Sequence, residues 1–385
     1  MAPLRILVLN AGSSSLKASL HDLDDAGADG DEPAGLIREL TTAGSEQSLD
    51  TVLDGLLAGS GPRTIDAIGH RVVHGGSALR ESVVVTPAVR ATIERVAEYA
   101  PAHNAAALAL MEAASRRFGD VVAQIAVFDT AFHRTLAPAA FTYAGPREWV
   151  EQGIRRFGFH GISHQYASQR TARLLDRAPT TLRIVTCHLG SGCSLAAVQA
   201  GRSVDTTMGF TPLDGVPMAR RSGAIDPGII FHLLRHGGHT ADSLDHLLNH
   251  EAGLAGLSGT TGDMREVLAA VDLGSSRARL ALDVFVRRIA QGIAAMATSL
   301  GGVDAIAFTG GVGEHSPRVR DEICALLAFL GVFIDAGRNA TAEGEADVSA
   351  EHASVRVVVV PSQENWMIAR ECVRVVGADR VPAGG

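Results

Sequence analysis

Three short turns rich in glycine and serine have the composition of phosphate-binding loops. They lie at residues 11–15, 188–194 and 310–314, and each follows an apolar segment typical of a buried strand. Such turns expose successive backbone N–H groups, and their small side chains let a phosphate approach closely. Because the P-loop and dinucleotide-binding motifs are absent, the three turns together carry the prediction of a phosphate ligand.

Two arginine-containing segments could bind an anion. Arg71 lies between two histidines in residues 69–76, and Arg221 follows a second arginine in residues 219–223. A guanidinium binds a carboxylate or a phosphate through two parallel hydrogen bonds, so both segments are candidate anion clamps. Most arginines of this chain are expected on the surface, but glycine and apolar neighbours predict tight, partly buried loops here.

Three further polar residues are candidates for chemistry, each with a structural alternative. Asp129 ends an apolar strand, where an acid can bind Mg²⁺ or its waters, or can equally cap the next helix. His160 lies among glycines and aromatics in residues 157–161, which disfavours a packed core position. Glu364 opens the last predicted helix, where a carboxylate also stabilises the helix dipole.

Hydrophobic periodicity predicts the strands and helices that must position these residues. The expected strands are 5–10, 16–23, 65–69, 82–86, 123–128, 183–187, 195–199, 202–206, 305–309 and 355–360, and the expected helices are 88–99, 104–118, 164–175, 226–235, 276–300 and 363–376. The strand–turn–strand pattern of residues 9–16 recurs at 187–194. It suggests a duplicated α/β domain with a ligand in the cleft between the halves, or a chance similarity of glycine turns.

Composition restricts the class of protein. A chain of 385 residues predicts two or three domains, and a net charge of −8 without a basic stripe disfavours nucleic-acid binding. Lys17 is the one lysine among 34 basic residues. The N-terminus lacks signal-peptide features, no apolar run is long enough to span a membrane, and four cysteines lack metal-site spacing. We therefore expect a cytoplasmic protein with reduced thiols.

Taken together, the motifs resemble the acetate kinase family, within the acetate and propionate kinases of the actin and sugar-kinase superfamily. The matching segments, in family order along nearly the whole chain, are 10–17, 70–76, 128–133, 158–164, 208–213, 221–227 and 311–314. The resemblance implies an α/β protein with a duplicated RNase H-like fold, as in actin, hexokinase and Hsp70, and an interdomain active-site cleft. The expected N-terminal acyl-kinase domain is 1–132 plus 366–385, closed by the C-terminal helix. The expected nucleotide-binding domain is 133–365.

The resemblance also implies an activity and a set of site residues. The activity is reversible, in-line phosphoryl transfer between ATP and acetate, giving acetyl phosphate and ADP, by a homodimer that uses Mg²⁺ or alternatively Mn²⁺. The implied catalytic residues are Arg71, Asp129, His160 and Arg221; the substrate-binding residues are Arg71, Val73, Ala102, Phe159 and Pro212; and the metal ligands are Asn10 and Glu364. The implied nucleotide-binding residues are Lys17, His188, Leu189, Gly190, Ser191, Gly192, Asp263, Met264, Arg265, Gly311, Val312, Gly313, Glu314 and His315. Because acetate is already ionised at neutral pH, we expect Asp129 to orient its neighbours or to bind waters of Mg²⁺ rather than to act as a general base.

The sequence departs from the family pattern at several positions, including Ser362 and Gln363 where the family usually has Thr-Asn. Ser191 replaces the usual asparagine, Met264 replaces phenylalanine, and Asn365 replaces a second acid after Glu364. Ala102 replaces a leucine beside the acyl methyl group, which predicts a larger pocket and a relaxed preference for acetate over propionate. The alternatives are a propionate-preferring kinase, a superfamily member that hydrolyses or senses nucleotide, and a non-catalytic relative. The two arginines argue against the second, and Ser191 alone supports the third.

Overall fold

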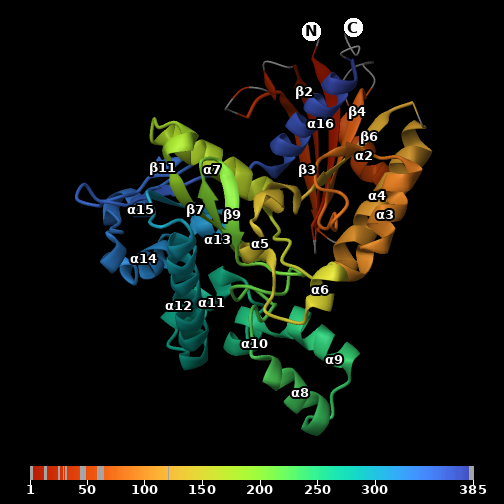
Figure 1. Cartoon of the computed structure of the whole chain (residues 1–385). Helices are drawn as coiled ribbons and strands as arrows, with labels where there is room; N and C mark the ends of the chain where they lie inside the picture. Colours follow the sequence, from red (N-terminus) through yellow and green to blue (C-terminus); the bar gives the residue numbers. More distant parts are fainter. Residues whose placement is uncertain are drawn as a thin grey trace. The chain divides into compact units, whose positions relative to one another are not determined.

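The structure is a computed structural model that describes residues 3–12, 15–24, 27–28, 30, 33–43, 49–58, 65–119 and 121–380. The chain divides into two compact units (Figure 1). Unit 1 comprises Met1–Arg134, Phe159–Ile162 and Gln363–Gly385, and unit 2 comprises Thr135–Gly158 and Ser163–Ser362. Among the described residues, none of the helices is long and apolar enough to cross a membrane.

Unit 1 is built on a six-stranded sheet in the order β3-β2-β1-β4-β6-β5. The strands are β1 (Leu4–Ala11), β2 (Ser15–Leu23), β3 (Leu36–Ala43), β4 (Ala67–Val72), β5 (Val83–Val84) and β6 (Ala123–Phe128). β1 pairs antiparallel with β2 and parallel with β4, and β4 pairs parallel with β6. The carboxyl ends of β1, β4 and β6 therefore lie at one edge of the sheet.

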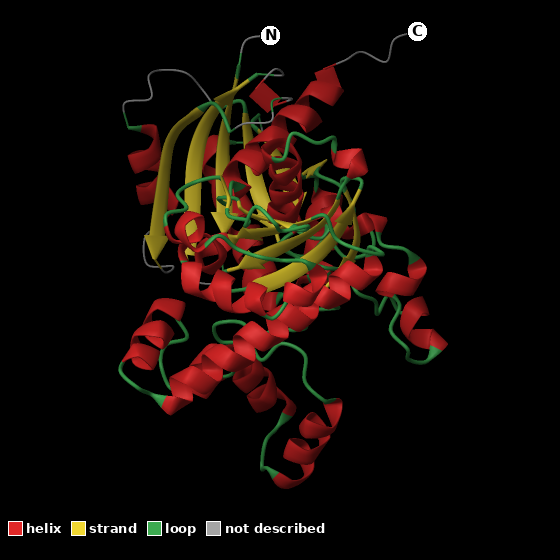
Figure 2. Ribbon diagram, turned by 90° about the vertical axis from the view of Figure 1, so that its left-hand side faces the viewer, coloured by secondary structure: helices red, strands yellow, loops and turns green. Residues whose placement is uncertain are grey.

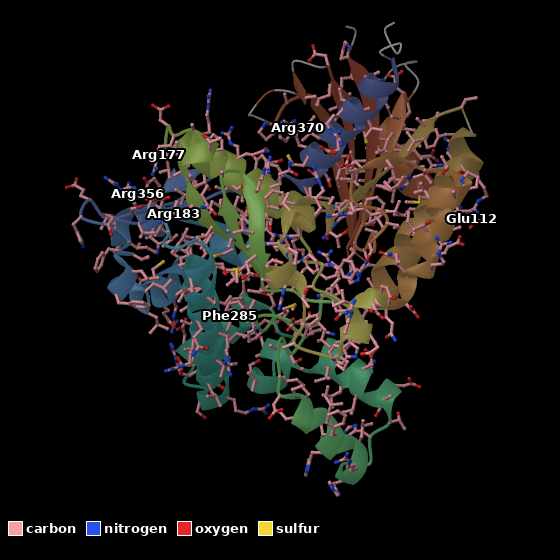
Figure 3. The ribbon with its side chains drawn as sticks, viewed as in Figure 1. Glu112, Arg177, Arg183, Phe285, Arg356 and Arg370 are labelled. Atoms are coloured by element: carbon pink, nitrogen blue, oxygen red, sulfur yellow. The ribbon has the colours of Figure 1, made fainter. Side chains whose placement is uncertain are left out.

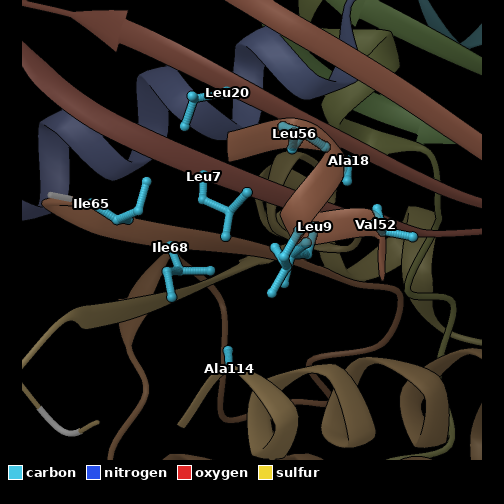
Figure 4. Packing of buried hydrophobic residues seen from close by; sticks show 10 residues of the cluster. Leu7, Leu9, Ala18, Leu20, Val52, Leu56, Ile65, Ile68 and Ala114 are labelled. Carbon is cyan, nitrogen blue, oxygen red and sulfur yellow. The ribbon is translucent and has the colours of Figure 1, made fainter. Parts of the chain in front are cut away.

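Helices cover both faces of this sheet. They are α2 (Leu49–Leu57), α3 (Pro87–Arg95), α4 (Pro101–Phe118) and α16 (Glu364–Arg380), with short 3-10 turns at Ala97–Tyr99 and Ala131–Thr135. On one face, residues of α2 and α4 join Leu7, Leu9 and Ile68 in an apolar core (Figure 4). On the other face α16 packs so closely that a Cβ on Gly69 would lie 2.6 Å from Ile368 Cγ2.

Unit 2 repeats the sheet of unit 1. Its strand order is β9-β8-β7-β10-β12-β11, from β7 (Arg183–Leu189), β8 (Cys193–Gln199), β9 (Arg202–Thr206), β10 (Ala305–Thr309), β11 (Ala346–Asp347) and β12 (Arg356–Val359). β7 pairs antiparallel with β8 and parallel with β10, and β10 pairs parallel with β12, as their counterparts do in unit 1. The predicted α/β class and the predicted duplication are confirmed.

The helices of unit 2 lie against its sheet and extend beyond it (Figure 2). They are α5 (Pro138–Phe141), α6 (Arg147–Glu151), α7 (Gly161–Leu174), α8 (Pro227–His236), α9 (Ala241–His246), α10 (Gly253–Ser258), α11 (Met264–Asp272), α12 (Ser276–Ser299), α13 (Gly310–His315), α14 (Pro317–Ala325) and α15 (Ala336–Ala340), with single turns at Pro179–Thr181, Leu247–Glu251 and Ala328–Leu330. The first two residues of α7 belong to unit 1. The central helix α12 buries one face, on which Phe285 is 1% exposed (Figure 3).

The predicted strands 65–69 and 82–86 have other bounds in the structure, as β4 and β5. Two further segments, 88–99 and 310–314, differ from the kind of structure that the sequence predicts. Residues 88–99 form a helix only to Arg95, where Val96 leaves helical geometry and a 3-10 turn follows. Residues 310–314 are the helix α13 rather than a loop. Gly310 adopts a φ of +77° beside β7, where a Cβ would lie 2.9 Å from the Leu189 carbonyl oxygen, so glycine here permits a tight strand-to-helix turn.

Candidate active site

In unit 1, an ion pair joins the ends of two neighbouring strands. Arg71 is the fifth residue of β4, and Asp129 directly follows β6. The guanidinium donates from Nε to Asp129 Oδ1 over 3.0 Å and from Nη2 to Oδ2 over 2.7 Å. Only 11% of the Arg71 side chain and 1% of the Asp129 side chain are exposed. Both carboxylate oxygens of Asp129 are therefore engaged by Arg71.

The remaining Nη1 group of Arg71 faces two further polar residues. It donates to Asn10 Oδ1 over 3.3 Å and lies 3.6 Å from Glu364 Oε2. Burial opposes the charge on Arg71, but the carboxylates of Asp129 and Glu364 outweigh it and raise the pKa of the guanidinium. Burial raises the pKa of Asp129, against the opposing effect of Arg71. The sheet edge thus gathers two acids, one amide and one permanent cation.

His160 lies beside this ion pair because its backbone is held by Asp129. The Asp129 carboxylate accepts a hydrogen bond from the His160 backbone N–H. The Gly161 N–H donates to the Asp129 carbonyl oxygen over 2.9 Å, and a Cβ on Gly161 would lie 2.1 Å from that oxygen. His160 itself has a φ of +54°, a left-handed conformation that a non-glycine residue rarely adopts. Strain of this kind is typical of functional sites.

The residues predicted to line a methyl pocket are partly brought together in unit 1. Val73 is 5% exposed and Phe159 1% exposed, and the Phe159 ring packs edge-on against His74 at 5.3 Å between centroids. Asn104 exchanges two hydrogen bonds with the His74 backbone, of 3.1 and 2.9 Å, which fixes the start of α4 beside Val73. The side chain of Ala102 lies outside the described residues, and Pro212 belongs to unit 2.

Asn10 and Glu364 fit a divalent cation in their chemistry. Asn10 Nδ2 donates to Glu364 Oε2 over 3.3 Å and to Asn365 Oδ1 over 3.0 Å, so the amide oxygen points to the charged cluster. The cluster brings two carboxyl groups, of Asp129 and Glu364, to the single guanidinium of Arg71. Carboxylate and amide oxygens suit Mg²⁺, which commonly takes one or two protein ligands plus waters and phosphates. Within the described ranges, no group of three or more histidines, cysteines or acids is arranged to hold a metal.

Unit 2 contains a cavity of about 460 Å³. Eight predicted nucleotide-binding residues line it: Gly190, Ser191, Asp263, Met264, Arg265, Gly311, Val312 and His315. Seven further residues line it. Ala219 and Arg220 belong to the segment predicted as an anion clamp, and sequence reasoning missed the other five: Leu254, Thr261, Gly262, Leu268 and Ser316. The cavity combines apolar side chains with glycine turns, which matches a ligand with a flat apolar part and a phosphate part.

Local structure explains the polar residues at this cavity. Asp263 is the N-cap of α11, accepting from the Arg265 backbone N–H over 2.9 Å, and its carboxylate also pairs with the exposed Arg265 guanidinium. The hydrogen bond from the Arg265 guanidinium, aided by the one from its backbone N–H, lowers the pKa of Asp263. The 188–194 turn is shorter than predicted: β7 continues to Leu189 and β8 begins at Cys193, which leaves residues 190–192 as the turn.

Six other predicted nucleotide-binding residues lie elsewhere among the described residues: Lys17, His188, Leu189, Gly192, Gly313 and Glu314. Lys17 is an exposed residue of β2 in unit 1, directly opposite Asn10 in the β1–β2 register. His188 Nδ1 and Ser163 Oγ are 2.8 Å apart, and Leu189 is buried. The Glu314 carboxylate accepts from the Ser362 backbone N–H over 3.0 Å. Their contact with nucleotide stays a prediction.

Arg221 has a defined partner in unit 2. Its Nη1 donates to the Pro212 carbonyl oxygen over 2.8 Å, so the two residues predicted for the reaction centre in this unit contact each other.

The predicted cleft between the two halves of the chain stays a prediction. So do the roles predicted for the two domains, acyl-phosphate chemistry and nucleotide binding.

Comparison with known proteins gives the same family as the motifs. The model of the acetokinase family matches residues 5–370. An acetate kinase from Gloeobacter violaceus is 48% identical over 399 residues, covering 96% of this chain and 98% of that protein. One from Trichormus variabilis is 46% identical over 400 residues, covering 96% of this chain and 98% of that protein.

Solved structures agree in fold. Porphyromonas gingivalis acetate kinase superimposes with a TM-score of 0.85 at 34% identity, covering 97% of this chain and all (100%) of that chain. A propionate kinase from Francisella tularensis superimposes with a TM-score of 0.86 at 34% identity, covering 96% of this chain and 98% of that chain. The resemblance stated from the motifs is confirmed: this chain belongs to the acetokinase family.

Proposed function

We propose that this chain is an acetate kinase, a phosphotransferase that moves a phosphoryl group reversibly between ATP and the carboxyl group of acetate. The observation that carries the proposal is the buried Arg71–Asp129 pair at the sheet edge beside Asn10 and Glu364. Three relatives named acetate kinase, which are 45–48% identical and cover 96% of this chain, support the same activity.

Arg71 is proposed to bind the carboxylate of acetate and the acyl phosphate. Since Nε and Nη2 are engaged by Asp129, the substrate would meet the Nη1 side of the guanidinium, which faces Asn10 and Glu364. Asp129 holds the guanidinium plane in one orientation, which supports a positioning role rather than proton transfer. His160 and Arg221 are proposed to neutralise the negative charge that spreads over the transferring phosphoryl oxygens.

Asn10 and Glu364 are proposed to hold Mg²⁺, with Mn²⁺ as the alternative. When bound, the ion would neutralise charge on the nucleotide phosphates. Family membership implies ATP as co-substrate and typically a divalent metal. Asn10 presents its oxygen to the cluster because its nitrogen is engaged by Glu364 and Asn365. Asn365, which replaces a second acid of the family pattern, thus still accepts a hydrogen bond and orients Asn10.

The cavity of unit 2 is proposed to bind ATP and ADP. The apolar side chains of Leu254, Met264 and Leu268 suit the base, and the glycines at 190 and 311 suit the phosphates. We also propose that Lys17, His188, Leu189, Gly192, Gly313 and Glu314 contribute to nucleotide binding. This assignment makes unit 2 the nucleotide-binding domain and unit 1 the acyl-kinase domain.

A homodimer is proposed as the working assembly. Helix α8 lies at the end of unit 2 away from its sheet (Figure 1). It has no buried residue, although Ile229, Phe231 and Leu234 are 46%, 54% and 40% exposed. Exposed apolar side chains clustered on one helix are typical of a subunit interface. A cytoplasmic location is also proposed, since all four cysteines are buried free thiols.

The test is an assay that traps acyl phosphate as a hydroxamate, run with ATP and acetate, propionate or butyrate in parallel. We expect hydroxamate from acetate, at a rate that depends on a divalent metal. Greater kcat/KM with propionate would favour the second candidate, a propionate-preferring kinase, which Ala102 and the similarity to a propionate kinase support. ADP release without any hydroxamate would contradict acyl transfer.

A further inference from the structure

The loop that contacts Arg221 is residues 206–214, which lead from the end of β9 to Asp214 without regular structure. Its residue Pro212 accepts the hydrogen bond from Arg221 Nη1 over 2.8 Å. The orientation of the Arg221 guanidinium therefore depends on where the backbone of this loop lies. A loop lacks the ladder of hydrogen bonds that joins the strands of a sheet. Other groups must therefore bond its backbone N–H and C=O groups and hold it in place.

Arg156 binds the first part of this loop. Its Nη1 donates to three successive carbonyl oxygens, of Thr206 over 3.0 Å, Thr207 over 2.8 Å and Met208 over 3.1 Å. The same nitrogen lies 3.6 Å from Asp214 Oδ2, near the end of the loop, and 22% of the Arg156 side chain is exposed. One guanidinium thus contacts both ends of the 206–214 loop.

Tyr143 binds the middle of the same loop. The Phe210 N–H donates to Tyr143 Oη over 2.9 Å, and the Tyr143 hydroxyl also hydrogen-bonds the Asp214 side chain. A Cβ on Gly209 would lie 2.1 Å from Tyr143 Oη and 2.3 Å from Asp214 Oδ2. The loop therefore passes against the phenol with no room for a side chain, which makes its path here narrowly defined.

These contacts form a connected path that ends at Arg221. Arg156 and Tyr143 fix the loop from Thr206 to Phe210, and Pro212 follows two residues later with the carbonyl that holds Arg221. We propose that Tyr143 and Arg156 are positioning residues, which aim Arg221 at the reacting phosphoryl group through the backbone of the 206–214 loop. The proposal rests on the proposed phosphotransferase function and adds two residues that carry no assigned role.

The path predicts a specific kinetic result. Displacing an aligned charged group by about 1 Å can cost about a hundredfold in rate, so loss of these contacts should lower kcat roughly ten- to a hundredfold. KM for ATP should stay within about twofold, because no residue of the 206–214 loop is among the residues lining the unit 2 cavity. A purely structural role would instead lower stability and the amount of folded enzyme.

The experiment compares Tyr143→Phe, Arg156→Lys and the control Arg147→Lys, whose side chain is 89% exposed on α6. Hydroxamate formation gives kcat and KM for ATP. Hydrogen–deuterium exchange measures the 206–214 loop, with the buried strand β10 as an internal folding standard. We expect Tyr143→Phe and Arg156→Lys to lower kcat and to speed exchange in the loop but not in β10, with Arg147→Lys unchanged in both readouts.

Further results distinguish a folding defect, failure of the positioning role and failure of the proposed function. Added guanidine should partly restore kcat to an Arg156→Ala variant, which a folding defect would not allow. Faster exchange in the loop with unchanged kcat would overturn the positioning role, as would unchanged exchange and kcat in both variants. Absence of hydroxamate from the wild-type enzyme would count against the proposed function instead, and the exchange result would still report whether these two side chains hold the loop.

Discussion

The carboxylate of Asp129 binds the guanidinium of Arg71 through both oxygens, with donor–acceptor distances of 3.0 and 2.7 Å. This arrangement leaves one side of Arg71 directed to Asn10 and Glu364. This geometry fits the proposed orienting role of Asp129, which needs no proton transfer. It also compensates the charge of a buried arginine, which would otherwise be costly.

Replacing Asp129 by asparagine should impair both turnover and stability. Asparagine keeps the shape, but its NH₂ group opposes the Arg71 donors and the buried guanidinium loses its counter-charge. Breaking a buried ion pair typically costs about 3–5 kcal/mol of stability. We expect kcat to fall at least a hundredfold, with a weaker dependence on Mg²⁺ concentration, measured by the hydroxamate assay. Wild-type turnover with an unchanged Mg²⁺ titration would contradict both the orienting role and a link to the metal.

Ala102 should make the enzyme tolerant of propionate. Each additional buried CH₂ contributes about 0.8 kcal/mol, roughly fourfold in kcat/KM, if the pocket has room for it. We expect kcat/KM for propionate within about a hundredfold of that for acetate, and Ala102→Leu should lower the propionate value at least fourfold while sparing acetate. Steady-state kinetics with both acids checks this. Equal effects of Ala102→Leu on the two substrates would contradict it.

The single lysine of the chain should not be replaceable by arginine. Lys17 is exposed opposite Asn10. An ammonium is a compact point charge, whereas a guanidinium is wide and planar. If Lys17 contacts the ATP phosphates, Lys17→Arg should raise KM for ATP several-fold. The matched control is the reverse exchange Arg38→Lys on the neighbouring strand β3, which should leave KM unchanged. The same KM in all three proteins would remove Lys17 from the nucleotide site.

Two buried histidines should make the fold acid-sensitive. Burial lowers the pKa of His21 and of His70 to about 4, from the ordinary histidine value of 6.5. Between these values the unfolded chain binds protons that the native state does not. Their contribution to stability is therefore complete above about pH 6.5 and is lost as the pH falls to about 4, by up to about 3 kcal/mol for each histidine.

Urea denaturation between pH 4.5 and 7.5 measures this effect. His70→Gln should unfold at a midpoint that changes less with pH than that of the wild type. His352→Gln, at an exposed position, should retain the wild-type pH dependence. Parallel curves for His70→Gln and wild type would show that His70 does not supply the sensitivity.

Disrupting α8 should dissociate the proposed homodimer. Phe231 is 54% exposed, and Phe231→Asp would place a charge where an apolar contact is expected. We expect light scattering after gel filtration to give twice the chain mass for the wild type and the chain mass for the variant. The control Arg235→Asp changes a charged residue of the same helix. A monomeric wild type would contradict the homodimer. A Phe231→Asp variant that stays dimeric would show that the interface does not include α8.

Three strands were predictable to the residue. β6, β9 and β10 begin and end where the sequence predicts, whereas β1 and β7 extend beyond their predicted bounds. β3 was not predicted, because it carries mostly exposed, mixed side chains and is held chiefly by its ladder with β2. Edge strands of this kind have little hydrophobic periodicity to detect.

The sequence identified the candidate residues of the site, but it could not show which of them contact one another. Asn10, Arg71 and Asp129 lie 61 and 58 positions apart, and the parallel pairing of β1, β4 and β6 brings them together. Glu364 lies 354 positions from Asn10 and reaches them because α16 packs on the same sheet. The cavity residues Leu254 and Leu268 were missed because an apolar residue lining a ligand cavity has the same helical spacing as one in a core.

The placement of α16 has a consequence for synthesis on the ribosome. The strands of unit 1 precede unit 2 in the sequence, yet the helix that covers the Gly69 face of their sheet, α16, follows it. Unit 2 has all of its residues before Gln363 and can close first. The sheet of unit 1 therefore stays bare on one face until α16 has been synthesised, and a chain stopped at Ser362 would expose that face and lack Glu364. Completion of the proposed active site and completion of the fold are thus the same late event.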